Sequence, residues 1–268
     1  MLIIMIEAVI TGIIQGITEW LPVSSEGVLA LVKTNFFGSE DVSGLFRQIL
    51  FLHLGTFFAA LVYLRSDVKA ILKTLFRYKS SSEKNQKILI FLLVSTLISG
   101  VLGIILLKFF IFTYSNMESP AEILTLLVGI LLVITAFLQL RSKEKGLRDA
   151  KDLNLKDAIV LGIAQGFSAL PGLSRSGLTV SFLLLKKFDK AVALRLSFLM
   201  SLPIVLAGNI LLNFRNLDTL GLEDLVAFMF AFLAGILTIH GLFKLAEKIN
   251  FGYFVLFFAA VVIFSRFL

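Results

Sequence analysis

Long apolar runs separated by short polar segments dominate this chain of 268 residues. The runs at 88–107 and 191–212 approach or reach the ~20 residues that a helix needs to cross the hydrocarbon of a bilayer. The pattern predicts an all-α polytopic membrane protein. Its six spanning helices are expected at 49–64, 88–110, 122–140, 191–213, 225–243 and 251–266.

Two further apolar segments, 1–37 and 157–187, are each broken near the middle by Pro, Ser and Gly. Their halves of about 15 residues are too short to span a bilayer. Each segment is therefore predicted to be a re-entrant helical hairpin. The segments are also copies of one another, because the stretch from Gly12 to Gly27 is repeated from Gly162 to Gly177.

The charged loops predict the topology. The loop at 65–87 carries seven basic and two acidic residues, and the loop at 141–156 carries six and three. Both are expected in the cytoplasm. Three spans then separate the hairpins, and an odd number of crossings makes the hairpins enter from opposite faces. We therefore predict an inverted-topology repeat, with a first repeat at 1–140, a cytoplasmic linker at 141–156 and a second repeat at 157–268.

The composition narrows the function classes. Apolar residues make up 58% of the chain, including 27 Phe, and the mean hydropathy is +0.96, so the expected surroundings are membrane lipids. The net charge of +7 does not indicate nucleic-acid binding, because the basic residues lie between apolar segments. The chain has no cysteine, which excludes disulfides, thiolate zinc sites and thiol catalysis.

Two surface patterns predict contacts. A Gly-x-x-x-Gly motif occurs in each copy, at 12–16 and 162–166, and permits close helix approach either within the chain or in a homodimer. Arg65 and the basic residues that recur every four positions after it leave the opposite helix face apolar. That segment is predicted to be an interfacial helix on anionic lipid.

Arg175 is the first candidate for site chemistry. A guanidinium inside an apolar hairpin needs an anion, and its planar fork suits phosphate oxygens. Ser174, Ser176 and Thr179 add hydroxyl donors around it. Gly172, with the proline before it, can end one half-helix so that the next begins near Ser174 and aims its free N–H groups at the anion. The alternative is that Arg175 pairs with a carboxylate and only holds the repeats together.

The first copy supplies carboxylates. Glu19 lies one helical turn beyond Gln15, so both can face one side, and Ser24, Ser25 and Glu26 follow closely. Glu19 can activate water or bind a cation, and Glu19 with Glu26 would hold Mg²⁺ or Ca²⁺ through hard oxygen ligands. In the alternatives, Glu19 forms a structural ion pair and Glu26 caps a helix or faces solvent.

The chain has two histidines, each within an apolar run. A lone histidine there is more often a hydrogen-bonded packing residue. His53 is the better functional candidate, because the first span can bring its imidazole to the first hairpin as a base or proton donor. His240 is expected near the cytoplasmic end of its helix, away from the site.

Two motifs carry a resemblance to a known family. Residues 15–25 (QGITEWLPVSS) and 171–179 (PGLSRSGLT) resemble the acidic first motif and the Pro-Gly-x-Ser-Arg-Ser-x-x-Thr motif of the bacitracin-resistance type of undecaprenyl-pyrophosphate phosphatase. Residues 52–56 (LHLGT) and 63–65 (YLR) extend the likeness, as do the length and the order of spans. The likeness covers essentially the whole chain.

The resemblance implies a multi-pass enzyme of the cell membrane that hydrolyses a polyprenyl (undecaprenyl) diphosphate to the monophosphate carrier lipid and inorganic phosphate. It implies a divalent cation and a role in recycling the carrier for cell-envelope and peptidoglycan synthesis. By motif position, Glu19 would be the acidic site residue, Ser25 a hydroxyl at the scissile phosphate, and Arg175 the phosphate clamp. The clamp would be assisted by Ser174, Ser176 and Thr179.

Two positions depart from that family's pattern. Gln15 stands where the family usually has Glu, and Val28 where it has a histidine that is thought to take part in the chemistry. Three outcomes are open: Glu26 or His53 is the base, Glu19 acts with a metal-bound water, or the reaction is lost and the lipid site is kept. Glu26 followed by glycine is taken to mark a divergent, archaeal branch.

A transporter or flippase of polyprenyl phosphate is the competing class of function. Inverted repeats with paired hairpins are also transporter architecture, and an arginine-lined site can bind a lipid phosphate without cleaving it. Transport predicts alternating access without phosphate release.

Overall fold

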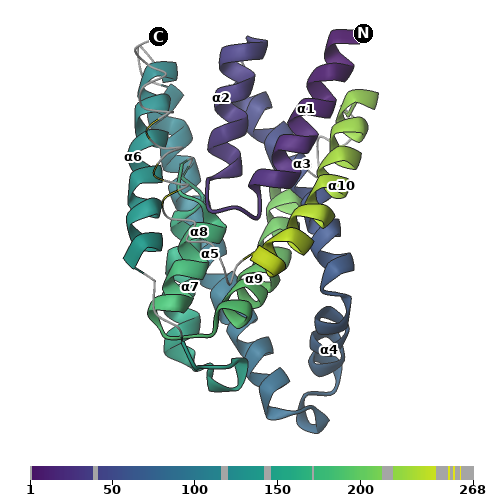
Figure 1. Cartoon of the computed structure of the whole chain (residues 1–268), viewed down its shortest axis with the longest axis vertical. Helices are drawn as coiled ribbons and strands as arrows, with labels where there is room; N and C mark the ends of the chain where they lie inside the picture. Colours follow the sequence, from purple (N-terminus) through teal and green to yellow (C-terminus); the bar gives the residue numbers. More distant parts are fainter. Residues whose placement is uncertain are drawn as a thin grey trace.

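The computed structural model describes residues 2–38, 42–115, 120–141, 146–170, 172–212 and 220–245, together with Tyr253, Leu256 and Ala260. Regular structure within these residues is helical (Figure 1). The elements are α1 (Leu2–Thr18), α2 (Ser25–Phe37), α3 (Val42–Tyr63), α4 (Arg65–Phe76), η1 (Tyr78–Ser80), α5 (Glu83–Ser115), α6 (Pro120–Arg141), η2 (Ala150–Asp152), α7 (Leu155–Phe167), α8 (Arg175–Leu185), α9 (Lys190–Leu212) and α10 (Leu222–Leu245).

The predicted spans coincide with α3, α5, α6, α9 and α10, and the predicted span at 251–266 lies outside the described residues apart from Tyr253, Leu256 and Ala260. Within the described part, α5, α9 and α10 are long and apolar enough to cross a bilayer. The bent pair of α3 and α4 makes a fourth if it counts as one span. The all-helical membrane class is therefore confirmed, whereas the count of six spans stays a prediction.

Both expected helix breaks are present. The first lies between α1 and α2, where Ser24 adopts a left-handed φ of 57° and its Oγ accepts from the backbone N–H of Gly27 at 3.3 Å. The second lies between α7 and α8, where Ser174 Oγ accepts from Gly177 N at 3.1 Å. A serine thus caps the second helix of each hairpin, since its oxygen satisfies an amide of the first turn.

The two hairpins meet at their tips. Gly172 N donates to Ser24 Oγ at 3.1 Å, and Ser176 Oγ donates to the carbonyl of Leu21 at 2.8 Å. Gly172 has a φ of 101°, which only glycine adopts without strain. In Figure 1 the outer ends of α1 and α2 lie on one side of the molecule, and those of α7 and α8 lie on the other side, towards α4.

Both Gly-x-x-x-Gly motifs are used within the chain. A Cβ on Gly12 would lie 2.3 Å from the carbonyl oxygen of Ala227, and one on Gly16 would lie 2.5 Å from Ala234 Cβ, so both glycines permit close approach of α1 to α10. Gly162 and Gly166 serve α7 in the same way against α5. The motifs therefore act in intrachain packing, and the homodimer stays a prediction.

Arg148 connects the two helices of the second hairpin at its outer end. Its guanidinium donates to Asp157 Oδ2 at 2.6 Å and to the carbonyl of Lys186 at 3.1 Å, and lies 4.1 Å from the ring centroid of Phe188. Asp157 also belongs to a capping box with Asn154 at the start of α7. Arg148 therefore connects the start of α7 to the end of α8. Its ion pair with Asp157 also satisfies a buried carboxylate.

Candidate active site

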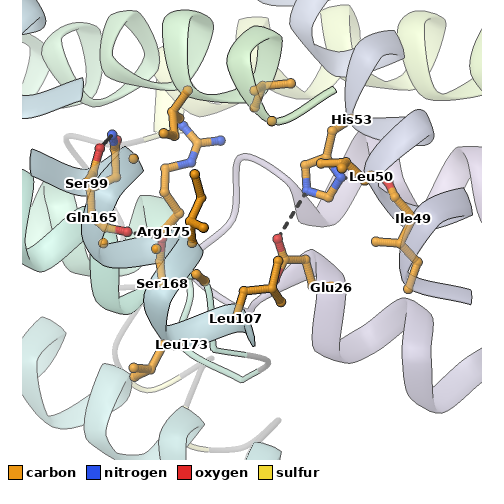
Figure 2. Close-up of a pocket in the computed structure, with 18 of the residues that line it drawn as sticks. Glu26, Ile49, Leu50, His53, Ser99, Leu107, Gln165, Ser168, Leu173 and Arg175 are labelled. Carbon is orange, nitrogen blue, oxygen red and sulfur yellow. Dashed lines mark hydrogen bonds and ion pairs between the residues drawn. The ribbon is translucent and has the colours of Figure 1, made fainter. Parts of the chain in front are cut away.

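A cavity of about 390 Å³ opens where the two hairpin tips meet α3, α5 and α9 (Figure 2). Its wall between α5 and α9 is apolar and includes Ile104, Leu107, Val205 and Leu211. The predicted site residues that line it come from both hairpins and from α3: Glu19, Ser24, Ser25, Glu26, His53, Ser174 and Arg175. Residues 156 positions apart in the chain thus share one cavity.

Glu19 is the centre of the polar contacts. Its Oε1 accepts from Arg175 Nη2, so the two repeats are joined by an ion pair. Its Oε2 accepts from Gln15 Nε2 at 3.0 Å and from Ser25 Oγ at 2.7 Å, and lies 3.1 Å from His53 Nε2. The side chains of Glu19 and Arg175 are only 4% and 12% exposed, and a buried pair needs such additional hydrogen bonds to offset desolvation.

Two helix N-termini point at the cavity. Ser25 is the first residue of α2 and Arg175 is the first residue of α8, and both line the cavity. The N-terminal end of a helix carries a partial positive charge and favours anions. The structure confirms that a helix begins just after Ser174, since α8 starts at Arg175. In the first hairpin, α2 starts just after Ser24 in the same way. Together with the Arg175 guanidinium, these ends make the site suitable for a phosphate group.

His53 brings α3 into the site. Its Nδ1 lies 2.7 Å from the carbonyl oxygen of Ile49, which fixes this nitrogen as the donor and leaves Nε2 facing the carboxylates. Nε2 lies 3.1 Å from Glu19 Oε2 and 3.8 Å from Glu26 Oε1, as Figure 2 shows for Glu26. Glu26 is 32% exposed and lines the cavity. His53 thus lies between the buried Glu19 and the more exposed Glu26 at the cavity.

Some predicted phosphate ligands have other contacts. Ser176 Oγ donates to the Leu21 carbonyl, and Thr179 donates to the carbonyl of Arg175 at 2.8 Å while its hydroxyl lies 2.6 Å from that of Ser197. Neither residue lines the cavity, and neither does Gly172. Their contacts join the hairpin tips and α9, so they support a positioning role, and direct phosphate binding by these three stays a prediction.

Four polar residues of the cavity were not predicted: Arg47, Ser99, Gln165 and Ser168. Gln165 Nε2 donates to Ser99 Oγ at 2.9 Å. The repeat did contain a signal for Gln165, which occupies the position of Gln15 in the second copy. Arg47 lies six residues before His53 on α3 and had no comparable signal.

The donor set does not fit a resident metal ion bound through Glu19, because both oxygens of this carboxylate are engaged by protein donors. Among the described residues, no three His, Asp or Glu side chains are arranged to hold a metal ion. Glu26 is the freer carboxylate of the predicted pair. Binding of Mg²⁺ or Ca²⁺ by Glu19 and Glu26 therefore stays a prediction without support from these contacts.

Val28, at the position of the family's histidine, is buried and does not line the cavity. His53 occupies the cavity instead, on a different helix. His240 lies on α10 with its ring 6.3 Å from that of Tyr63 and does not line the cavity, as expected.

The fold and the site define an all-helical membrane protein with a cavity, lined by Arg175 and by serine hydroxyls, at the meeting point of two helical hairpins. Residues 8–264 match the family described as "Bacitracin resistance protein BacA". The chain belongs to this family, as its two motifs predicted.

Curated relatives cover nearly the whole chain. A protein of Methanococcoides burtonii is 41% identical over 265 residues, which are 98% of each chain. One of Methanothrix thermoacetophila is 36% identical over 252 residues, 93% of this chain and 92% of the relative. One of Bacteroides fragilis is 34% identical over 262 residues, which are 95% of this chain and 94% of the relative. All three are named undecaprenyl-diphosphatase.

Proposed function

We propose that this protein is an undecaprenyl-diphosphatase of the cell membrane, which cleaves the phosphoanhydride bond of a polyprenyl diphosphate to give the monophosphate and inorganic phosphate. The observation that carries the proposal is the cavity itself. A cationic, hydroxyl-rich end at Arg175 and Ser25 adjoins an apolar wall between α5 and α9. A lipid diphosphate has the same division between a multiply charged head and an apolar tail. The names of the relatives support hydrolysis rather than transport.

The proposed membrane arrangement is the inverted-topology repeat of six spans and two re-entrant hairpins. It is supported by the opposed outer ends of the hairpins in Figure 1 and by the basic loop at 65–87 on the side of α4. The acidic start of α10, with Glu223 and Asp224, lies at the opposite end of the molecule from α4 (Figure 1). The charge distribution therefore agrees with the positive-inside rule.

Arg175 is proposed to bind the terminal phosphate. Substrate oxygens would replace Glu19 Oε1 as one acceptor of the guanidinium, because a diphosphate carries more negative charge than a carboxylate. Arg175 and the N-terminal ends of α2 and α8 would then face the charge that develops on the transferring phosphoryl group. Stabilising that charge with preorganised donors is the main way in which enzymes accelerate phosphoryl transfer.

Ser25, His53 and Glu26 are proposed to manage the proton. Ser25 Oγ donates to Glu19 Oε2 and lines the cavity, where its hydroxyl would lie beside the scissile phosphate. The Nε2 atom of His53 faces both Glu19 and Glu26. Once its Nε2 proton has passed to Glu19 Oε2, His53 can take the proton of the attacking water or hydroxyl as general base. This role for His53 would explain how the chain tolerates Val28 at the family's histidine position.

A divalent cation is proposed to bind together with the diphosphate, through Glu26 and phosphate oxygens. When bound, such an ion neutralises phosphate charge. Glu19 keeps its contacts with Gln15, Ser25 and His53 in this proposal.

The purified protein in detergent tests the proposed function. With undecaprenyl diphosphate and Mg²⁺ or Ca²⁺, it should release inorganic phosphate and the lipid monophosphate in equal amounts, whereas Arg175→Ala should release neither at a comparable rate. If the parent protein releases no phosphate with either cation and yet moves the labelled lipid across proteoliposomes, the transport alternative is correct and the diphosphatase proposal is wrong.

A further inference from the structure

The helix α4 turns sharply away from the helix before it. The segment from Arg47 to Tyr63 and the helix Arg65–Phe76 meet at an angle of 86°. If α3 runs across the bilayer, α4 therefore runs along its surface. The bend lies at Leu64, which is buried and provides no side-chain cap.

One face of α4 is anchored to the protein. Val68 and Ile71 pack against the main hydrophobic core, and Thr74 is buried with its hydroxyl donating to the carbonyl of Ala70 at 2.8 Å. Asp67, the acidic residue of this helix, lies 3.4 Å from Arg195 on α9. These contacts fix the orientation of α4, so its remaining faces are presented in a defined direction.

The next face of α4 is apolar and uncovered. Leu72 is 50% exposed, Leu75 is 51% exposed and Phe76 is 83% exposed. Their spacing of three and four residues places them on one side of the helix. A strip of this kind is unfavourable in water, because apolar surface gains free energy when it is buried.

A basic stripe runs beside the apolar strip. Arg65, Lys69 and Lys73 recur every fourth residue and are exposed, and Arg77 follows directly after the helix. An apolar strip flanked by a basic stripe on a helix in the membrane plane is the arrangement of an interfacial amphipathic helix. A second copy of this chain fits less well, since two basic stripes would repel one another.

We propose that α4 is a binding site for anionic phospholipid in the cytoplasmic leaflet. Leu72, Leu75 and Phe76 enter the acyl region, while Lys69 and Lys73 bind the headgroup phosphates. Each lysine near such a surface contributes about 1 kcal/mol of attraction. The proposal concerns a surface remote from the candidate active site and does not rest on the proposed hydrolysis.

The test uses a fluorescent probe on α4. Because the chain has no cysteine, Leu72→Cys can carry a single environment-sensitive fluorophore in nonionic detergent. Titration with phosphatidylglycerol should shift its emission to the blue at much lower lipid concentration than phosphatidylcholine does. Lys69→Gln with Lys73→Gln should raise the phosphatidylglycerol concentration for the half-shift about 30-fold. The matched control, Lys151→Gln with Lys156→Gln, removes two exposed cytoplasmic lysines outside α4 and should change nothing.

Equal half-shift concentrations for the two lipids would overturn the proposal, and so would a control that weakens the response as much as the α4 variant. Phe76→Ser provides a second reading, because it retains every charge. It should weaken the response to both lipids by about tenfold or more, the effect of losing one buried aromatic side chain. An unchanged response in this variant would show that the apolar strip does not enter the lipid.

Discussion

Replacing His53 by glutamine isolates the proton-transfer step of the proposed reaction. In the structure His53 Nε2 lies 3.1 Å from Glu19 Oε2 and 3.8 Å from Glu26 Oε1. A glutamine amide has similar reach and still donates to Glu19, so the ion pair with Arg175 is kept. It does not accept a proton at neutral pH. The substitution therefore removes the proposed base and leaves the phosphate clamp in place.

The expected magnitude follows from that geometry. General-base catalysis contributes about 10²–10⁴-fold, and we expect a fall in kcat of about 100-fold because Glu26 remains near the cavity. KM should change by less than about threefold, since the groups proposed to bind the ground-state substrate are not altered. The assay is phosphate release from saturating undecaprenyl diphosphate. His240→Gln is the matched control, because it replaces the other histidine outside the cavity, and it should keep the parent kcat.

The double variant His53→Gln with Glu26→Gln extends the test. If both residues act on one proton, the double variant should lose at most about tenfold more than His53→Gln alone, because residues that act as a unit are non-additive. A His53→Gln enzyme whose kcat stays within about threefold of the parent would refute the assignment of His53 as base. Equal losses in His53→Gln and His240→Gln would refute it as well.

Three further substitutions and one binding experiment test other contacts of the structure. Arg175→Lys should lower kcat/KM by about 10²-fold in the phosphate-release assay, since an ammonium cannot donate two parallel hydrogen bonds. Gly16→Leu should lower the thermal midpoint and destabilise the protein by at least about 1–3 kcal/mol, because even a Cβ would lie 2.5 Å from that of a residue on α10. Arg148→Ala should cost about 3 kcal/mol in unfolding experiments, as it leaves buried Asp157 unpaired. Calorimetry should detect Mg²⁺ or Ca²⁺ binding with a non-hydrolysable lipid diphosphate and little without it, since Glu19 is engaged by protein donors; equally strong binding to the free protein would contradict this.

The helix breaks at the hairpin tips could be predicted from the sequence, because they depend on local chemistry. Proline and glycine interrupt a helix, and Ser24 and Ser174 cap the next one, so short-range patterns suffice. The pairing of Glu19 with Arg175 was among the alternatives, because a buried guanidinium requires an anion. The structure adds that this pair lies inside the cavity, so structural and catalytic roles are compatible.

The remaining site residues depend on long-range packing. Ser176 and Thr179 are near Arg175 in the sequence, but successive helix positions point in different directions, and their hydroxyls satisfy backbone and side-chain groups at the hairpin tips. Ser99 and Arg47 reach the cavity from α5 and α3. No local motif marks such residues, because their neighbours in space are distant in the chain.

The most direct test of a single site shared by the two hairpins is a double-mutant cycle with Glu19→Gln and Arg175→Ala. Phosphate release from undecaprenyl diphosphate is measured for the parent, both single variants and the double variant. We expect each single variant to lose about 10³-fold in kcat/KM and the double variant to lose at most about tenfold more, because the residues act as one unit. Losses that multiply to about 10⁶-fold would show independent action, and would contradict a site formed jointly by the two repeats.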